Sequence, residues 1–165
     1  MSAIGENPYV GAQPLTPKNP LFGRDREVRD LYFLLSKERI VLMYAPSGAG
    51  KSSLLEGAGG LLDQMYERFH VWPVTRVNTE PSVPCRNRYV LSALLGFERA
   101  APPEHMRSED QLAGLTLRDG VMSRWRHPDD PSLILLTFDQ FEEIVRLIPT
   151  DVEGQWEFFR QLGDL

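Results

Sequence analysis

The 165-residue sequence has very little cysteine: Cys85 is the only one. A single cysteine cannot form a disulfide within the chain, and it argues against a metal site built from cysteine ligands. We interpret Cys85 as a small structural residue rather than as a nucleophile.

The sequence also lacks long apolar runs and an excess of basic residues. No run approaches the roughly 18–20 apolar residues that cross a bilayer, and no basic-then-apolar signal peptide begins the chain. The net charge of −5 argues against a dominant nucleic-acid-binding surface. We expect a cytoplasmic protein with no membrane partner, and nucleic acid is not indicated.

The most informative segment that is present is residues 45–53, Ala-Pro-Ser-Gly-Ala-Gly-Lys-Ser-Ser. It follows an apolar run at 39–44, which predicts a strand, and it precedes a predicted helix at 52–69. This order is typical of a phosphate-binding P-loop, in which small residues let successive backbone N–H groups point at phosphate oxygens. A glycine-rich surface turn ending in a solvated lysine is the alternative, which the flanking strand and helix disfavour.

The P-loop pattern assigns roles to individual residues. Lys51 can reach the β- and γ-phosphates of a nucleoside triphosphate, and the Ser52 hydroxyl can ligate magnesium. Ala45 replaces the glycine that usually begins the pattern, which is tolerable if its φ stays negative. The predicted nucleotide-binding residues of the loop are Pro46, Ser47, Gly48, Ala49, Gly50, Lys51, Ser52 and Ser53. A loop that binds nucleotide without efficient hydrolysis remains an alternative.

The rest of the chain divides into a proline-rich segment at 1–20 and a domain at 21–165. The segment is expected to be extended or irregular, either as a disordered leader or as an arm laid across the domain. Glycines at 57–60 predict a bend, break or close backbone contact in the helix at 52–69. The other expected elements are helices at 25–37, 89–95, 110–125 and 140–147, strands at 71–77 and 132–138, loops at 79–87 and 99–109, and a turn at 128–131.

A second motif follows the continuous apolar run at 132–138, which fits a strand buried on both faces of a parallel sheet. Asp139 then lies where ligands bind, beyond the carboxyl end of the strand, and it can hold magnesium. Glu142 is our first choice, and Glu143 our second, for orienting or deprotonating the attacking water. Alternatively, these acids form only a favourable charge cluster at the start of the helix at 140–147.

Asp139 follows Lys51 by 88 positions, which leaves room for an intervening strand and favours the additional-strand ATPases over the kinase-like or Ras-like group. The predicted fold is therefore a three-layer α/β/α P-loop NTPase domain with a mainly parallel sheet. A metabolic P-loop kinase is disfavoured, because two adjacent glutamates follow the acidic residue and no basic lid is evident.

Three motifs occur together: Phe-Gly-Arg-Asp-Arg-Glu at 22–27, the P-loop, and Asp-Gln-Phe-Glu-Glu at 139–143. In this combination the chain resembles the STAND class of signalling NTPases, and more narrowly the bacterial novel STAND group. The resemblance implies that Phe22, Gly23 and Arg24 lie near the adenine and ribose, that Asp139 and Ser52 hold Mg²⁺, and that Glu142 and Lys51 act in hydrolysis.

The resemblance also implies a biological role. Such proteins are switches, closed with ADP and oligomeric with ATP, and many bacterial members serve in antiphage defence or signalling. Self-association and flanking sensor and effector domains are the implied partners. A complete STAND domain continues further than Leu165, so we expect this chain to be the N-terminal part of one and inactive as an ATPase alone. The alternative is a non-hydrolysing nucleotide-binding or scaffold fragment.

Overall fold

The computed structural model describes residues 15, 18–66, 68–124 and 133–165. The chain divides into two compact units, Met1–Val71 and Trp72–Leu165. Expectations for residues 1–14, for the turn at 128–131 and for Trp125 lie outside the described residues.

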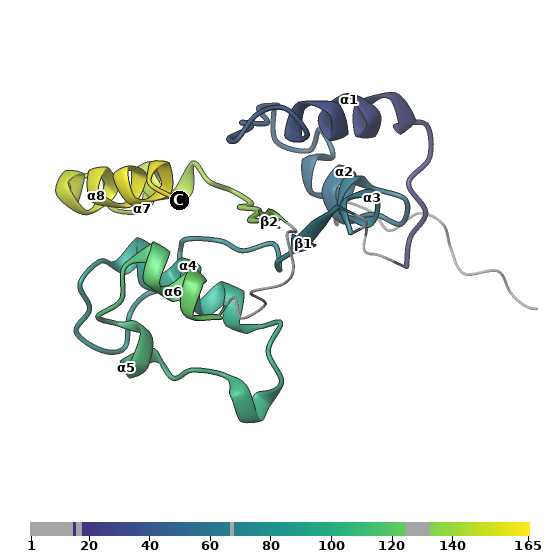
Figure 1. Cartoon of the computed structure of the whole chain (residues 1–165). Helices are drawn as coiled ribbons and strands as arrows, with labels where there is room; N and C mark the ends of the chain where they lie inside the picture. The colour runs from purple at the N-terminus through teal and green to yellow at the C-terminus, as the bar shows by residue number, and fades with distance from the viewer. Residues whose placement is uncertain (1–14, 16–17, 67, 125–132) are drawn as a thin grey trace, which may run out of the picture. The chain divides into compact units, whose positions relative to one another are not determined.

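The first unit contains α1 (Asp25–Leu35), α2 (Lys51–Glu56), α3 (Leu61–Met65) and β1 (Phe69–Val71). Helix α3 packs against both α1 and α2 (Figure 1). Asp25 and Glu27 lie in the first turn of α1, where negative charge favours the helix dipole. The buried apolar residues of this unit are Val28, Leu54, Leu61, Leu62, Met65 and Phe69.

The glycines at 57–60 break the helix that was predicted at 52–69. Helix α2 ends at Glu56 and α3 begins at Leu61. A Cβ atom on Gly57 would lie 2.6 Å from the Ser53 carbonyl oxygen, and one on Gly60 would lie 2.6 Å from the Gly57 carbonyl oxygen. Gly59 has φ +74°. The expected break is therefore confirmed, since only glycine fits so close to these carbonyl groups.

The described end of the proline-rich segment lies along the first unit. Pro20 and Ala58 form a parallel bridge, in which the Leu21 N–H donates to the Ala58 carbonyl at 3.1 Å. The Leu15 N–H donates to Ser53 Oγ at 2.9 Å. These hydrogen bonds tie Leu15 and Leu21 to residues 53 and 58 of the first unit.

The strand predicted at 39–44 is not formed. Residues 40–46 have neither helical nor strand structure. The side chains of Ile40, Leu42 and Tyr44 are exposed, whereas Val41 and Met43 are half-buried, so the two-residue alternation of an extended chain is present. The prediction was wrong because a strand is defined by ladder hydrogen bonds to a neighbour, which an apolar run does not supply by itself.

The second unit contains a short parallel pairing of two extended segments. The chain that follows β1 pairs with β2 (Leu133–Leu135) and the residues after it. The Trp72 N–H donates to the Leu135 carbonyl at 3.1 Å, and the Thr75 N–H donates to the Thr137 carbonyl at 3.0 Å. Thr75 and Phe138 form a parallel bridge. Helices and parallel strands are thus mixed, as expected for an α/β protein, although the strands are shorter than predicted.

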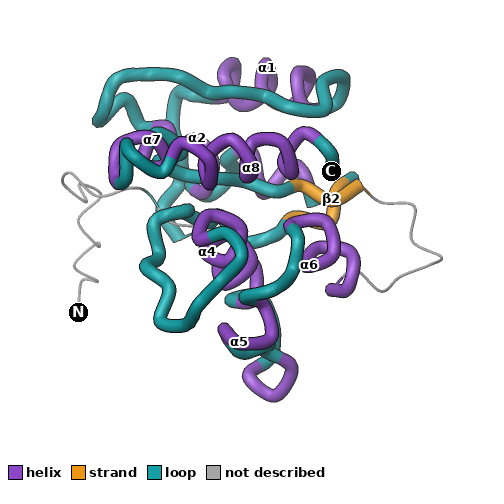
Figure 2. The backbone as a smooth tube through the Cα atoms, turned by 90° about the vertical axis from the view of Figure 1, so that its left-hand side faces the viewer, coloured by secondary structure: helices purple, strands orange, loops and turns teal. Residues whose placement is uncertain are grey.

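The helices of the second unit are α4 (Arg88–Glu98), a 3₁₀ turn (Pro103–His105), α5 (Glu109–Leu112), α6 (Leu117–Arg124), α7 (Glu143–Leu147) and α8 (Val152–Gly163). Helix α4 packs against α5, α6 and α8 (Figure 2). The helix predicted at 110–125 is split into α5 and α6, and α7 begins three residues later than predicted. Sequence reasoning missed α8.

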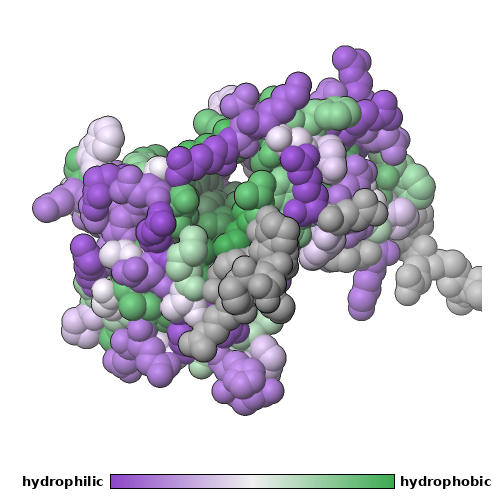
Figure 3. All heavy atoms as spheres, viewed as in Figure 1, coloured by the Kyte–Doolittle hydropathy of each residue, from purple (hydrophilic) through white to green (hydrophobic). Residues whose placement is uncertain are grey.

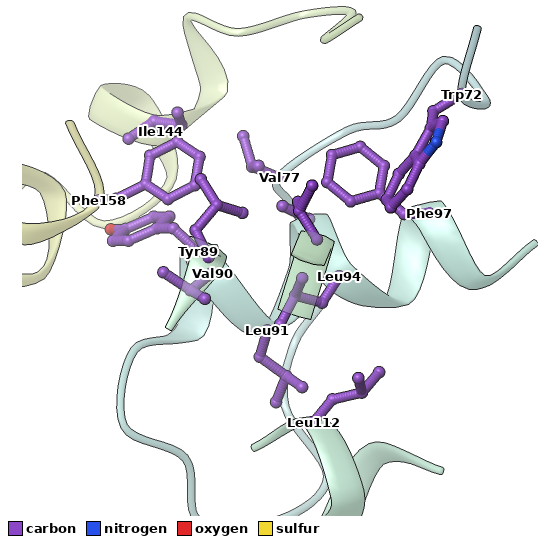
Figure 4. Packing of buried hydrophobic residues seen from close by; sticks show 13 residues of the cluster. Trp72, Val77, Tyr89, Val90, Leu91, Leu94, Phe97, Leu112, Ile144 and Phe158 are labelled. Carbon is purple, nitrogen blue, oxygen red and sulfur yellow. The ribbon is translucent and has the colours of Figure 1, made fainter. Parts of the chain in front are cut away.

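Helix α4 supplies most of the buried core of the second unit. In Figure 4, Tyr89 and Val90 of α4 face Ile144 of α7 and Phe158 of α8. At the other end of α4, the rings of Phe97 and Trp72 meet edge to face, with centroids 5.0 Å apart. The visible side of α8, by contrast, carries mainly hydrophilic side chains (Figure 3). The described chain contains no helix with the length and apolar character needed to span a membrane.

Candidate phosphate-binding loop and acidic motif

The predicted phosphate loop lies within the first unit and turns on two glycines. Gly48 has φ +79°, and Gly50, which precedes α2, has φ +80°. The Ala49 N–H donates to the Pro46 carbonyl at 3.2 Å and closes the turn. Such a glycine-rich turn ahead of a helix is the backbone form that presents N–H groups to an anion. Pro46, Ser47 and Gly48 are exposed at this turn.

Lys51 folds back over this loop. Its Nζ donates to the Ala45 carbonyl at 2.7 Å and to the Pro46 carbonyl at 3.2 Å. A lysine ammonium has three donors and is strongly hydrated, so oxygen acceptors are its natural partners. The Ala45 and Pro46 carbonyl groups hold the Lys51 charge beside the glycine turn. Ala45, in the place of the usual glycine, is not among the described residues with positive φ.

The two serines of the loop lie in different surroundings. Ser52 is half-buried in the first turn of α2. Ser53 Oγ accepts the N–H of Leu15, so its hydroxyl fastens the N-terminal arm to the loop helix. The contact of Ser53 with Leu15 was not expected from the sequence, because it joins residues 38 positions apart.

The residues expected near the adenine and ribose lie in the same unit. The Phe22 side chain is 80% exposed, and Gly23 has φ +71°. Arg24 precedes α1, and its Nε lies 3.0 Å from Oε1 of Glu27. An exposed aromatic ring is a surface on which a base can stack, and a left-handed glycine turns the chain sharply into α1.

The acidic motif lies within the second unit, after β2. The Asp139 side chain is 12% exposed, and its Oδ2 lies 3.0 Å from Nη2 of Arg76. The next residue, Gln140, has φ +52°, the only positive φ of a non-glycine residue in the described chain. A left-handed backbone at such a residue costs of order 1 kcal/mol and turns the chain away from the strand direction.

Glu142 and Glu143 differ in their hydrogen bonding. Oε2 of Glu143 accepts a hydrogen bond from Nδ2 of Asn78 at 2.8 Å. Glu142, which precedes α7, is exposed. Arg76 and Asn78 were not predicted as site residues. Residues two apart on an extended segment point to the same side, but nothing in the sequence linked this segment to the acidic motif.

The structure therefore gathers the predicted residues in two sets. The loop residues 46–53 and residues 22–24 belong to the first unit, and Asp139, Glu142 and Glu143 belong to the second. No group of three or more histidine, cysteine, aspartate or glutamate side chains suited to a metal ion occurs among the described residues. A magnesium ion held mainly by phosphate oxygens and water needs only one or two protein ligands, and the Asp139 carboxylate fits that use.

The family model Novel STAND NTPase 1 matches residues 8–165. This match spans nearly the whole chain, and the chain belongs to that family. Comparison with curated proteins and with solved structures gives no significant match. The family supports a STAND NTPase and a nucleotide as ligand, in line with the resemblance of the three sequence motifs.

Proposed function

We propose that this chain is the nucleotide-binding part of a STAND-type switch that binds ATP or ADP with magnesium. The observation that carries the proposal is the position of Lys51, whose Nζ lies across the glycine turn on the Ala45 and Pro46 carbonyls. A lysine ammonium beside a glycine turn that precedes a helix is the arrangement that binds phosphate in P-loops. The glycine geometry and the family membership support the same ligand.

In this proposal, loop 46–53 binds the phosphates. Gly48 and Gly50 keep their left-handed conformations, so the N–H groups are arranged before the ligand arrives. Lys51 exchanges its two carbonyl acceptors for β- and γ-phosphate oxygens. Binding would cost the loop little reorganisation free energy, because only the flexible Lys51 side chain must move. Phe22, Gly23 and Arg24 take the adenine and ribose.

Asp139 and Ser52 are the proposed magnesium ligands. The ion, when bound, neutralises charge that develops on the transferred phosphoryl group. Glu142 is the proposed residue that orients the attacking water. The Asn78–Glu143 hydrogen bond supports this choice over Glu143, since a carboxylate already accepting from an amide is less available to a water molecule.

The remaining elements of the proposal follow from the family. The chain forms part of a three-layer α/β/α domain, acts in the cytoplasm and switches between ADP and ATP states. Self-association and flanking sensor and effector domains supply the output, in signalling or antiphage defence.

The test is nucleotide affinity and turnover of the 165-residue chain. Fluorescent ADP should bind to the wild type and bind at least tenfold more weakly to Lys51→Ala, because one phosphate ion pair is lost. Lys37→Ala removes an exposed lysine that follows α1 and is the matched control. Equal affinity of the Lys51→Ala variant and the wild type would remove the P-loop assignment.

The second candidate is a nucleotide-binding scaffold without turnover. The observation that favours it is that two of the three acids are engaged, Asp139 by Arg76 and Glu143 by Asn78. Binding of ADP without ATP hydrolysis, in the chain and in a longer protein containing it, supports the scaffold. Hydrolysis that is lost in Glu142→Gln while ADP affinity is kept supports the switch ATPase.

A further inference from the structure

We infer that Arg76 is a built-in counter-cation of Asp139 that must leave the carboxylate before a divalent cation can bind there. The inference rests on the proposed function, in which Asp139 holds magnesium. It adds a residue that no sequence motif identified, and it gives that residue a role in setting the metal concentration at which the site fills.

The pairing of Arg76 with Asp139 is dictated by the backbone. The Asp139 N–H donates to the Thr75 carbonyl at 2.9 Å, and the Thr75 N–H donates to the Thr137 carbonyl at 3.0 Å. These bonds fix the register of the two extended segments. Arg76 directly follows Thr75, and its Nη2 lies 3.0 Å from Oδ2 of Asp139.

A second contact fixes the backbone from the helix side. Ser92 Oγ of α4 donates to the Arg76 carbonyl at 3.2 Å and accepts the Thr79 N–H at 3.0 Å. The main chain of Arg76 is therefore held between α4 and the Asp139 segment. These bonds do not hold the Arg76 side chain.

Exposure decides which partner moves. The Asp139 side chain is 12% exposed, whereas the Arg76 side chain is 45% exposed. A largely covered carboxylate is poorly hydrated, so its negative charge is best placed beside a positive one. The guanidinium can rotate into water at small cost, because ion pairs with an exposed partner contribute little stability. A divalent cation carries twice the charge and replaces it.

The geometry thus predicts competition between the Arg76 guanidinium and the metal for the Asp139 carboxylate. Removing the Arg76 charge should lower the metal concentration that half-saturates the site. The alternative is that Arg76 positions Asp139 for the metal, and this predicts the opposite change. The two roles are therefore distinguished by whether the half-saturating metal concentration falls or rises when the Arg76 charge is removed.

The experiment titrates Mn²⁺, a paramagnetic substitute for Mg²⁺, into the 165-residue chain in excess over ADP. Loss of the free-Mn²⁺ paramagnetic resonance signal reports binding, with ADP alone as the blank. Arg76→Gln should lower the half-saturating Mn²⁺ concentration about two- to fivefold, the size expected for one half-exposed ion pair. Arg76→Lys, which keeps the charge, should stay near the wild type.

Arg99→Gln removes an exposed arginine of the same unit and controls for the change in net charge. Asp139→Asn should raise the half-saturating concentration, and Arg76→Gln should have no effect in that background. An unchanged or raised value in Arg76→Gln alone overturns the inference, and so does an Asp139→Asn variant that binds Mn²⁺ as the wild type does. Failure of the proposed function is distinguished by metal-free ADP binding, which depends on Lys51 and is independent of Arg76.

Discussion

A Cβ atom added to Gly96 would lie 1.5 Å from Oγ1 of Thr75. Helix α4 therefore rests directly on the extended segment that carries Arg76 and Asn78. The Phe97 and Trp72 rings meet beside this contact. The absence of a side chain at Gly96 thus helps to place the two residues that contact the acidic motif.

Gly96→Ala should destabilise the second unit by about 1–3 kcal/mol, because the new methyl group must push Thr75 and α4 apart. Urea denaturation measures this loss. Gly114→Ala is the control, since a Cβ there meets nothing within 4 Å and its stability should change by less than about 0.5 kcal/mol. Equal stability of the two variants would contradict the packing described here.

Arg107→Met should be destabilising, by about 1–3 kcal/mol, because it leaves the buried Glu98 carboxylate with only the more distant Arg124, whose Nη1 lies 3.9 Å from Oε2. Glu98 is 1% exposed, and the Arg107 Nε donates to its Oε1 at 2.8 Å. The double variant Glu98→Gln, Arg107→Met should recover part of the loss, since the buried negative charge that lost its nearest cation is gone. Thermal and urea unfolding of Glu98→Gln, Arg107→Met and the double variant form a double-mutant cycle. Additive losses would rule out direct coupling.

The exposed ion pair of Glu157 and Arg160 on α8 should make the stability of the protein depend on pH. Hydrogen bonds from Arg160 and then Gln161 lower the pKa of Glu157 from 4.5 to about 2. A depressed pKa means that the stabilisation is present above pH 4.5 and is lost as the pH falls toward 2. Carboxyl ¹³C titration by NMR measures the pKa. Arg160→Gln should return it toward 4.5, and an unchanged value would show that Arg160 is not the cause.

Opposite substitutions in the phosphate loop should have unequal effects. Gly50→Ala should weaken ADP binding and cost about 1 kcal/mol of stability, because a side chain is strained at φ +80°. Ala45→Gly should leave ADP affinity unchanged and lower stability by about 0.4–1 kcal/mol, through the greater freedom of the unfolded chain. Tighter ADP binding by Ala45→Gly would contradict this prediction and show that Ala45 weakens nucleotide binding.

Gln140→Gly should stabilise the second unit by up to about 1 kcal/mol, because φ +52° is strained for glutamine and not for glycine. Gln140→Val should be destabilising, since a β-branched residue tolerates this conformation least. Urea denaturation of the pair measures the difference. Equal stability of the two variants would mean that the backbone at this position relaxes without cost.

Local rules predicted the elements whose causes lie close together in the sequence. The spacing of apolar residues gave α1 nearly to its bounds, and the glycines at 57–60 gave the break between α2 and α3. The positive φ values of Gly48 and Gly50 agree with the predicted loop. Each of these features depends on the conformation of a few neighbouring residues, which composition and order specify.

Features that depend on distant partners were missed or misjudged. The apolar run at 39–44 alternates as a strand does but lacks strand structure, and α8 was missed although its apolar residues pack against α4 and α6. Arg76 meets Asp139 across 63 positions of sequence. The residues next to Arg76 in the sequence do not reveal that it pairs with Asp139, because the register between the two segments is set by tertiary packing.

The sequence alone determined the family, the glycine turn with Lys51 and the order of the motifs, because these are properties of contiguous residues. The tertiary structure decided which acid is engaged and by what: Arg76 with Asp139, and Asn78 with Glu143. It did so because Gly96 lets α4 lie against Thr75, and the parallel pairing then fixes which side chains stand beside the acidic motif.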